Sequence, residues 1–219
     1  MKKTLLALAL PVLMSGAAHA GLVNGGFEAP VIPPGTYSFQ PESNVPGWAT
    51  SASDDIIEIW STPFNGVAAY DGQQFAELNA NQVSTLYQNV GGIAAGSSVG
   101  WQFAHRGRDG VDTMRFVLTD LGTDNTFGTA DDTVLDSKTV STGNAAWSFH
   151  TGAGIIALGN TVRFSFISLN SVTGNSYGNF LDAADFGVGV GAVPEPGSLA
   201  LAGLALAGVG ALSRRRKAA

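Results

Sequence analysis

The sequence predicts an all-β protein, a β-sandwich of jelly-roll type, with one apolar helical segment at each end of the chain. Short runs rich in Val, Ile, Phe, Thr and Trp recur between Gly, Asn, Asp and Pro, and no convincing helical period appears between the terminal segments. Within residues 161–169, Val162, Phe164 and Phe166 share one face while Arg163 and Ser165 share the other. Such alternation is typical of a sheet with one buried face.

Eight runs have the composition of strands, and turn residues separate them at intervals of roughly 8 to 12 residues. They cover residues 56–60, 73–79, 85–90, 99–106, 113–119, 133–140, 161–169 and 179–190. The number fits a jelly-roll sandwich better than a barrel, although the pattern does not fix the strand order. Residues 29–46 hold five of the nine prolines, which predicts a long surface loop.

Residues 1–20 have the layout of a secretory signal peptide. Lys2 and Lys3 precede an apolar run at 5–14, and small residues then lead to Ala20. This layout predicts cleavage between Ala20 and Gly21. The run is too short for a membrane span, which needs roughly 20 apolar residues.

Residues 193–219 form a second targeting segment, with a motif at 193–197, a transmembrane helix at 198–213 and a basic end at 214–217. The motif contains Val193, Pro194, Glu195 and Pro196. The apolar stretch 199–212 would extend about 21 Å as a helix, which is short against a hydrocarbon core of roughly 30 Å and suits a temporary anchor. Basic residues beside apolar helices stay in the cytoplasm, so residues 21–192 are predicted to be exported.

The order of Pro-Glu-Pro, apolar helix and Arg-rich end resembles the PEP-CTERM sorting signal. The resemblance implies cleavage by an exosortase in a Gram-negative bacterium that makes extracellular polysaccharide. It further implies transient anchoring in the inner membrane, followed by delivery to the cell surface or the extracellular matrix. An ordinary tail anchor is the alternative interpretation of the same segment.

The predicted β-sandwich domain, residues 21–192, is strongly acidic and long enough for one substantial core. It has five basic residues against sixteen acidic ones, a net charge of −11, which argues against a nucleic-acid partner. The chain has no cysteine, which excludes disulfides, a thiol nucleophile and thiolate zinc ligands. Calcium, which prefers oxygen ligands, is therefore the expected cofactor.

Short sequence motifs near both ends of this domain resemble the first and last strands of secreted jelly rolls with a galactose-binding-like fold, including many carbohydrate-binding modules. The motifs are NGGFE at 24–28, PGW at 46–48 and GNFLD at 178–182. The resemblance implies a structural calcium ion bound by Glu28 and Asp182, although the Asp that often follows is Ala183 here. Asp182 shares strand parity with Phe180 and Phe186 and is expected to point toward the core, where an unpaired carboxylate is costly. Alternatively, Glu28 and Asp182 cap turns or lie at a solvated edge.

A second candidate calcium site is the loop 120–132, where four carboxylates lie within thirteen residues. They belong to Asp120, Asp124, Asp131 and Asp132. Glycines in the loop allow sharp turns that could bring oxygen ligands together, but the loop is not an EF-hand because it lacks the closing Glu. The alternative is a solvated hairpin loop with Asx-turns.

Candidate ligand-binding residues are the arginine doublet Arg106 and Arg108 and three aromatic residues near loops, Trp48, Trp60 and Tyr70. The arginines could bind a carboxylate, a sulfate or an acidic sugar through bidentate hydrogen bonds, and the exposed rings could stack on sugars. The arginines could instead pair with nearby carboxylates, namely those of Asp109, Asp112 or Glu77. Trp101 is expected in the core, and His105 is expected to be a partly buried, hydrogen-bonded histidine.

The leading hypothesis is a non-catalytic protein of the cell surface or of a biofilm or exopolysaccharide matrix, glycan-binding and stabilised by calcium. The first rival is a secreted polysaccharide hydrolase that uses Glu58 and Glu77, since glycoside hydrolysis needs two carboxylates. No His-Glu-x-x-His motif occurs in the sequence. The second rival is an adhesin that binds other proteins.

Overall fold

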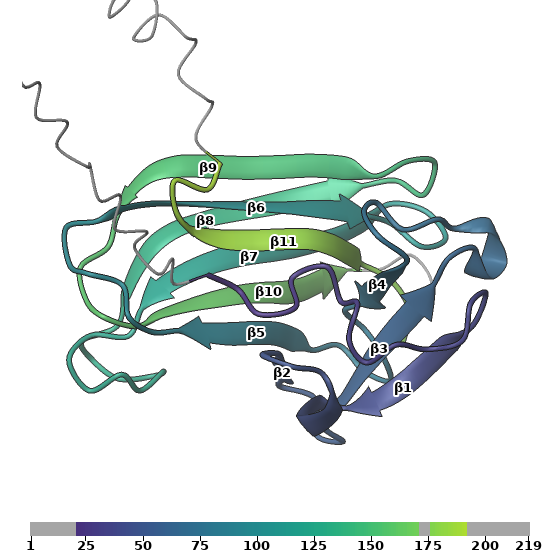
Figure 1. Cartoon of the computed structure of the whole chain (residues 1–219), viewed down its shortest axis with the longest axis horizontal. Helices are drawn as coiled ribbons and strands as arrows, with labels where there is room; N and C mark the ends of the chain where they lie inside the picture. The colour runs from purple at the N-terminus through teal and green to yellow at the C-terminus, as the bar shows by residue number, and fades with distance from the viewer. Residues whose placement is uncertain (1–20, 171–175, 192–219) are drawn as a thin grey trace, which may run out of the picture.

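The computed structural model describes residues 21–170 and 176–191, which form two antiparallel β-sheets (Figure 1). The cleavage position after Ala20, the sorting motif at 193–197 and the transmembrane and basic segments that follow it lie outside these residues. Within the described ranges, no helix is long and apolar enough to cross a membrane.

Eleven strands make up the two sheets of the described chain. The first sheet has the order β1 (Tyr37–Pro41), β3 (Ile56–Ser61), β4 (Gln74–Glu77), β11 (Phe180–Val188), β6 (Ser98–Arg106) and β9 (Ser148–Ile156). The second has the order β2 (Ala49–Thr50), β5 (Thr85–Val90), β10 (Val162–Asn170), β7 (Asp112–Asp120) and β8 (Thr133–Thr142). Two 3-10 turns, Glu42–Asn44 and Phe64–Gly66, are the only helical elements there, so the all-β prediction is confirmed.

The strand order is that of a jelly roll. From β4 onward the chain repeatedly crosses between sheets, and strands distant in sequence become neighbours, giving β4-β11-β6-β9 in one sheet and β5-β10-β7-β8 in the other. Two four-stranded sheets of this kind define the double-sheet jelly roll. The remaining strands extend this unit, because β3 and β1 continue the first sheet beyond β4 and β2 continues the second beyond β5.

The sandwich has an aromatic core. Phe116 lies at its centre, with its ring centroid 4.4 Å from that of Trp101 and 4.9 Å from that of Phe164. Trp101 is therefore a core residue as predicted. Trp48 was expected to be exposed and is instead buried, because it stacks on Phe27 with a centroid distance of 5.0 Å. The main core lies within 21–191, so this segment is expected to fold as one unit.

Three strands were not predicted, and each has a physical reason. Strand β1 lies inside the proline-rich stretch 29–46, and Pro41 is tolerated because β1 is an edge strand and ends there. Strand β2 has only two residues. Strand β9 contains Gly152, where a Cβ atom would lie 2.5 Å from the Trp101 ring, so a residue that looks like a turn signal is needed for close packing.

The outer face of the first sheet carries a second hydrophobic cluster, formed by Trp60, Val67, Phe75 and Phe180. Strand alternation explains it, because Ile57 and Ile59 of β3 point into the sandwich while residues 58 and 60 point outward. This buried outer face positions the candidate site described next.

Candidate functional site

Strand register brings two carboxylates and three aromatic rings together at the β1 edge of the first sheet. Tyr37 lies opposite Trp60 and Phe39 lies opposite Glu58 in the β1–β3 pair, and Glu58 lies opposite Glu77 in the β3–β4 pair. Directly opposed side chains of antiparallel strands share one face and lie in contact range. The two carboxylates that the sequence offered as a possible pair are therefore true neighbours.

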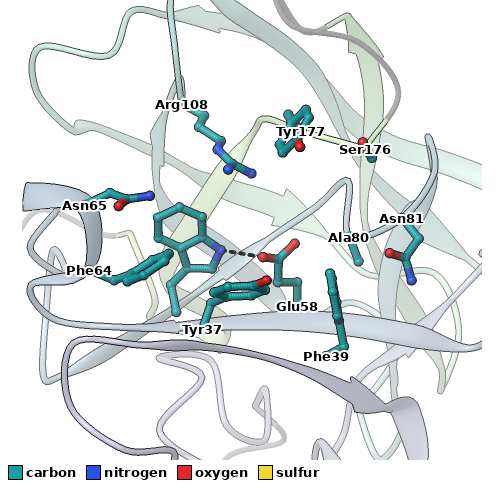
Figure 2. Close-up of a pocket in the computed structure, with 11 residues that line it drawn as sticks. Tyr37, Phe39, Glu58, Phe64, Asn65, Ala80, Asn81, Arg108, Ser176 and Tyr177 are labelled. Carbon is teal, nitrogen blue, oxygen red and sulfur yellow. Dashed lines mark hydrogen bonds between the residues drawn. The ribbon is translucent and has the colours of Figure 1, made fainter.

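All of these residues except Glu77 line a cavity of about 230 Å³. In Figure 2, Arg108 and Tyr177 lie on one side of it and Tyr37 and Phe39 on the other, with Asn65 and Asn81 at opposite ends. The full lining comprises Tyr37, Phe39, Glu58, Trp60, Phe64, Asn65, Ala80, Asn81, Arg108, Ser176 and Tyr177. The cavity thus combines aromatic surfaces with amide, hydroxyl, guanidinium and carboxyl groups.

Arg108 is fixed by an ion pair and by two rings. Its Nη1 donates to both carboxylate oxygens of Glu77, at 3.0 and 2.9 Å. Its guanidinium carbon lies 4.1 Å from the ring centroid of Tyr177 and 4.8 Å from that of Trp60. The side chain of Arg108 is 18% exposed and that of Glu77 is fully buried. The positive charge of Arg108 is therefore largely neutralised within the protein.

The two buried carboxyl groups differ in protonation. Burial raises the pKa of Glu58, and the neighbouring charge of Glu77 raises it further. Burial also raises the pKa of Glu77, but the backbone N–H of Gly178 and the guanidinium of Arg108 oppose that effect. Glu58 is thus the group that holds a proton near neutral pH. The indole N–H of Trp60 donates to Glu58 Oε1 at 2.9 Å, the dashed line in Figure 2.

Arg106 and His105 precede Arg108 but do not line the cavity. Arg106 donates to the carbonyl oxygen of Asn144. His105 is fully buried, with Nδ1 2.9 Å from Thr142 Oγ1 and Nε2 3.0 Å from Asn179 Oδ1. Burial lowers the pKa of His105 to about 4, so the ring is neutral at pH 7. The prediction of a hydrogen-bonded histidine is confirmed.

Among the predicted ligand-binding residues, the cavity brings together only Trp60 and Arg108. The prediction that Trp60 is exposed is wrong, because its ring packs in the second hydrophobic cluster and is buried. Tyr70 is exposed, but its ring stacks on Phe149 with a centroid distance of 5.7 Å, outside the cavity. Trp48 is in the core.

Sequence reasoning missed Phe39, Asn65, Asn81 and Ser176. The alternation of Tyr37 and Phe39 is a strand signal that the surrounding prolines obscured.

Glu28 and Asp182, the first candidate calcium ligands, converge on one loop. Glu28 Oε1 accepts the N–H groups of Gln73 and Gln74 at 2.6 and 2.9 Å. Asp182 Oδ2 accepts those of Tyr70 and Asp71 at 2.8 and 3.0 Å. Gly72 allows this approach, because a Cβ there would lie 2.1 Å from Glu28 Oε1.

Asp182 is fully buried as expected, but beneath this loop on the outer face of the first sheet rather than in the main core. A register shift between Asp182 and Asp185 changes the parity, so Phe186 faces the sandwich while Phe180 faces outward. Burial raises the pKa of Asp182 to about 7.

The carboxylates of the loop 120–132 bond mainly to groups in and beside the loop. Asp120 is buried and accepts the N–H groups of Gly122, Leu158 and Gly159. The other three accept backbone N–H groups within the loop, Asp124 from Thr126, Asp131 from Thr123 and Asp132 from Gly128. Within 21–170 and 176–191, no group of three or more His, Asp or Glu side chains could hold a metal ion. Calcium binding by this loop stays a prediction.

Three solved structures similar to this chain are carbohydrate-binding modules. TmCBM61, solved in complex with β-1,4-galactotriose, has 16% identity and a TM-score of 0.48, over 78% of this chain and 98% of that chain. The CBM22-1 xylan-binding domain of Paenibacillus barcinonensis Xyn10C has 11% identity and a TM-score of 0.45, over 72% and 88%. The C-terminal family 22 module of Clostridium thermocellum Xyn10B has 15% identity and a TM-score of 0.44, over 74% and 99%.

The comparison with known families identifies the end of the chain. No curated protein matches the sequence significantly. Residues 192–217 match the family model of the PEP-CTERM protein-sorting motif, as the sequence predicts. Such a motif indicates an exported protein that is anchored transiently in the membrane and processed by an exosortase. The chain is therefore a β-sandwich of jelly-roll type that carries a C-terminal PEP-CTERM protein-sorting motif.

Proposed function

We propose that this protein is a non-catalytic glycan-binding component of the cell surface or extracellular matrix of a Gram-negative bacterium, and that the cavity beside Trp60 and Arg108 binds the sugar. The single observation that supports this function most is the composition of the cavity wall. Tyr37, Phe39 and Tyr177 are partly exposed rings, and the adjacent polar groups can serve as hydrogen-bond donors and acceptors. Sugars have apolar ring faces and polar edges, which such a wall complements.

The size of the cavity favours a single sugar ring. Its volume of about 230 Å³ lies below the roughly 300–1,000 Å³ typical of pockets for drug-sized ligands. A terminal sugar, or one ring of a chain that passes over the opening, fits this space. Asn65 and Asn81 at the two ends supply amide groups that can discriminate between hydroxyl configurations.

The hydrolase hypothesis is less well supported by the same geometry. Glu58 and Glu77 lie directly opposite each other in the β3–β4 pair, and the charge of Glu77 raises the pKa of Glu58. The side chain of Glu77 is also fully buried and bound to Arg108, so no sugar reaches it. Burial raises the pKa of both groups, and the charge of Glu77 raises that of Glu58 further. A structural role for this pair explains every contact it makes.

A calcium ion bound by Glu28 and Asp182 is part of this proposal. A Cβ on Gly26 would lie 3.9 Å from Glu28 Cγ and 4.0 Å from Asp182 Oδ1, so both side chains flank the same glycine. Asp182 is a buried carboxyl group that a cation would stabilise in its charged form. Two carboxylates fit calcium only in part, and backbone carbonyls or water would complete the 6–8 oxygens it needs.

Binding and hydrolysis assays on a glycan panel test the function. Residues 21–191 should bind at least one neutral glycan without releasing reducing sugar. Phe39→Ala should weaken this binding about tenfold, since loss of one stacked ring is worth about 1.4 kcal/mol. Phe149→Ala is the matched control, because Phe149 is 46% exposed against 45% for Phe39 and does not line the cavity. Equal losses in both variants, or sugar release that Glu58→Gln abolishes, would contradict the proposal.

Delivery to the surface needs a separate test in the cell. Replacing Pro194, Glu195 and Pro196 with alanine should leave a membrane-held precursor with an uncleaved tail. Immunoblots of membrane and surface fractions measure this outcome, and normal surface delivery of the altered protein would count against sorting through the motif.

A further inference from the structure

A second hollow, of about 360 Å³, lies on the outer face of the second sheet, and no residue lines both it and the cavity at Trp60. Its floor comes from β5, β10 and β7, which lie side by side in Figure 1. The lining comprises Ser51, Thr85, Tyr87, Arg115, Val117, Thr119, Phe127, Asp132, Val134, Arg163, Ser165 and Ile167. We call this feature the sheet-face hollow.

Two arginines lie at opposite ends of the sheet-face hollow. Along β10, Arg163 stands four residues before Ile167, and Ile167 lies opposite Arg115 of β7. Four residues of strand correspond to ~13 Å at ~3.3 Å per residue. Between the two ends, Ser165 and Val117 lie opposite each other and form the floor. The hollow therefore has two cationic ends separated by a mostly uncharged floor.

Two aromatic rings and one hydrogen bond hold the guanidinium of Arg163 in place before any ligand binds. Its guanidinium carbon lies 3.8 Å from the ring centroid of Tyr87 and 4.1 Å from that of Phe127. Its Nε donates to Asn89 Oδ1 at 2.9 Å. Because a guanidinium has five N–H donors, this bond leaves others for a ligand, and the stacking reduces the entropy lost on binding.

The charges of these two arginines are not cancelled by ion pairs. Among the residues that the structure describes, ion pairs within 4.0 Å involve only Arg108. Among the described residues that line the hollow, Asp132 is the one carboxylate, and its charge acts on Arg163. The sheet-face hollow thus presents two guanidinium groups against one carboxylate, on a domain whose net charge is −11.

We propose that the sheet-face hollow binds an acidic polysaccharide, a linear glycan whose rings carry carboxylate or sulfate groups. Arg163 and Arg115 would each bind an anionic group through charge-assisted hydrogen bonds. The separation of ~13 Å requires a ligand of several rings, whose apolar faces would rest on Tyr87 and Val117. The distant carboxylates of the domain oppose this binding only weakly, because the Debye length is about 8 Å at physiological ionic strength.

A glycan fits this surface better than an acidic peptide. The hydroxyl side chains of Ser51, Thr85, Thr119 and Ser165 match the hydroxyl groups of sugar rings. Strands β5, β10 and β7 each have a neighbour on both sides, so the floor offers no free strand edge to which a peptide could add. The inference does not depend on sugar binding at the Trp60 cavity.

Calorimetric titration of residues 21–191 with three probes tests the inference. The probes are a hexasaccharide of galacturonate, a hexasaccharide of galactose and a hexapeptide of glutamate. The galacturonate probe should bind at least tenfold more tightly than the other two. Arg163→Gln and Arg115→Gln should each weaken its binding about tenfold, as expected for loss of a hydrogen bond to a charged group. Val134→Glu should also weaken it, because Val134 is 61% exposed and lines the hollow.

Two controls isolate the sheet-face hollow. Lys138→Gln removes one positive charge from the same sheet without touching the lining and should leave the affinity unchanged. Phe39→Ala should weaken only binding at the other cavity, so failure of one site is distinguished from failure of the other. Equal loss in Lys138→Gln, equal affinity for the galactose probe, or equal affinity for the glutamate peptide would each overturn the inference.

Discussion

Replacing Arg108 with methionine removes the partner of a carboxylate that has no access to water. The side chain of Glu77 is fully buried, and both of its oxygens accept hydrogen bonds from Arg108. Breaking a buried ion pair by removing one partner costs about 3–5 kcal/mol. Because the Arg108 side chain is 18% exposed, we expect the lower end of that range, about 3 kcal/mol at pH 8.

The loss of stability in Arg108→Met should increase as the pH rises. Without Arg108, the folded-state pKa of Glu77 rises further above its unfolded value. The native state then binds more protons than the unfolded state between these two pKa values, so the free energy of unfolding falls by up to about 1.4 kcal/mol per pH unit as the pH rises. Arg108→Met should therefore cost little at pH 5, where Glu77 is protonated, and most at pH 8.

Urea denaturation of residues 21–191, followed by tryptophan fluorescence at pH 5, 6.5 and 8, measures this dependence. Arg106→Met is the matched control, because Arg106 donates to a carbonyl oxygen and makes no ion pair in the described chain. The double variant Arg108→Met with Glu77→Gln should recover most of the loss at pH 8. A loss that is equal at pH 5 and pH 8, or below about 1 kcal/mol at pH 8, would refute the reasoning.

Three further predictions concern the core, a buried histidine and the proposed calcium ion. Phe116→Ala should lower the free energy of unfolding by about 3–5 kcal/mol, whereas Val31→Ala, at an exposed position, should change it by less than about 0.5 kcal/mol in the same urea titration. Because the pKa of His105 is lowered to about 4, the unfolded state binds more protons than the native state between pH 4 and 6.5. As the pH rises across that range, the free energy of unfolding of the wild type should increase by up to about 3 kcal/mol relative to that of His105→Gln. Parallel curves of this free energy against pH for the two proteins would contradict the prediction. Removing calcium with a chelator should lower the Tm more at pH 8 than at pH 5.5, because Asp182, with a pKa of about 7, must lose its proton to bind a cation. Asp182→Asn is the control, and its Tm should be the same with and without calcium.

The fold class followed from the sequence because strand alternation is a local property. Residues 161–169 show this, since Val162, Phe164 and Phe166 are all buried and strand β10 differs from the predicted range by one residue at each end. Burial of Asp182 was also predictable from parity, but its location was not. The register shift after Asp182 reverses the facing of Phe186, and neither position looks unusual in the sequence.

The candidate site was harder to predict because its parts depend on pairing between distant strands. Glu58 and Glu77 were recognised as a possible pair, but only the β3–β4 register shows that they are direct neighbours. Phe39 reaches the site only because β1 adds to the edge of β3, within a stretch whose prolines indicate a loop. Trp48 was wrongly predicted to be exposed for the opposite reason, because loop residues flank it in the sequence while its ring packs against Phe27.

The arginines illustrate why charge in a sequence does not identify an anion site. The doublet at 106 and 108 looked like the strongest cationic feature, yet Arg108 compensates Glu77 and supports the wall of a cavity. Arg163 and Arg115 are isolated in the sequence, but the β10–β7 pairing places them on one outward face with no ion pair in the described residues. If the two proposed sites bind as inferred, one domain can contact a sugar ring and an acidic chain at the same time. Linking two chains in this way raises the effective concentration of each contact, which is what a structural component of a polysaccharide matrix requires.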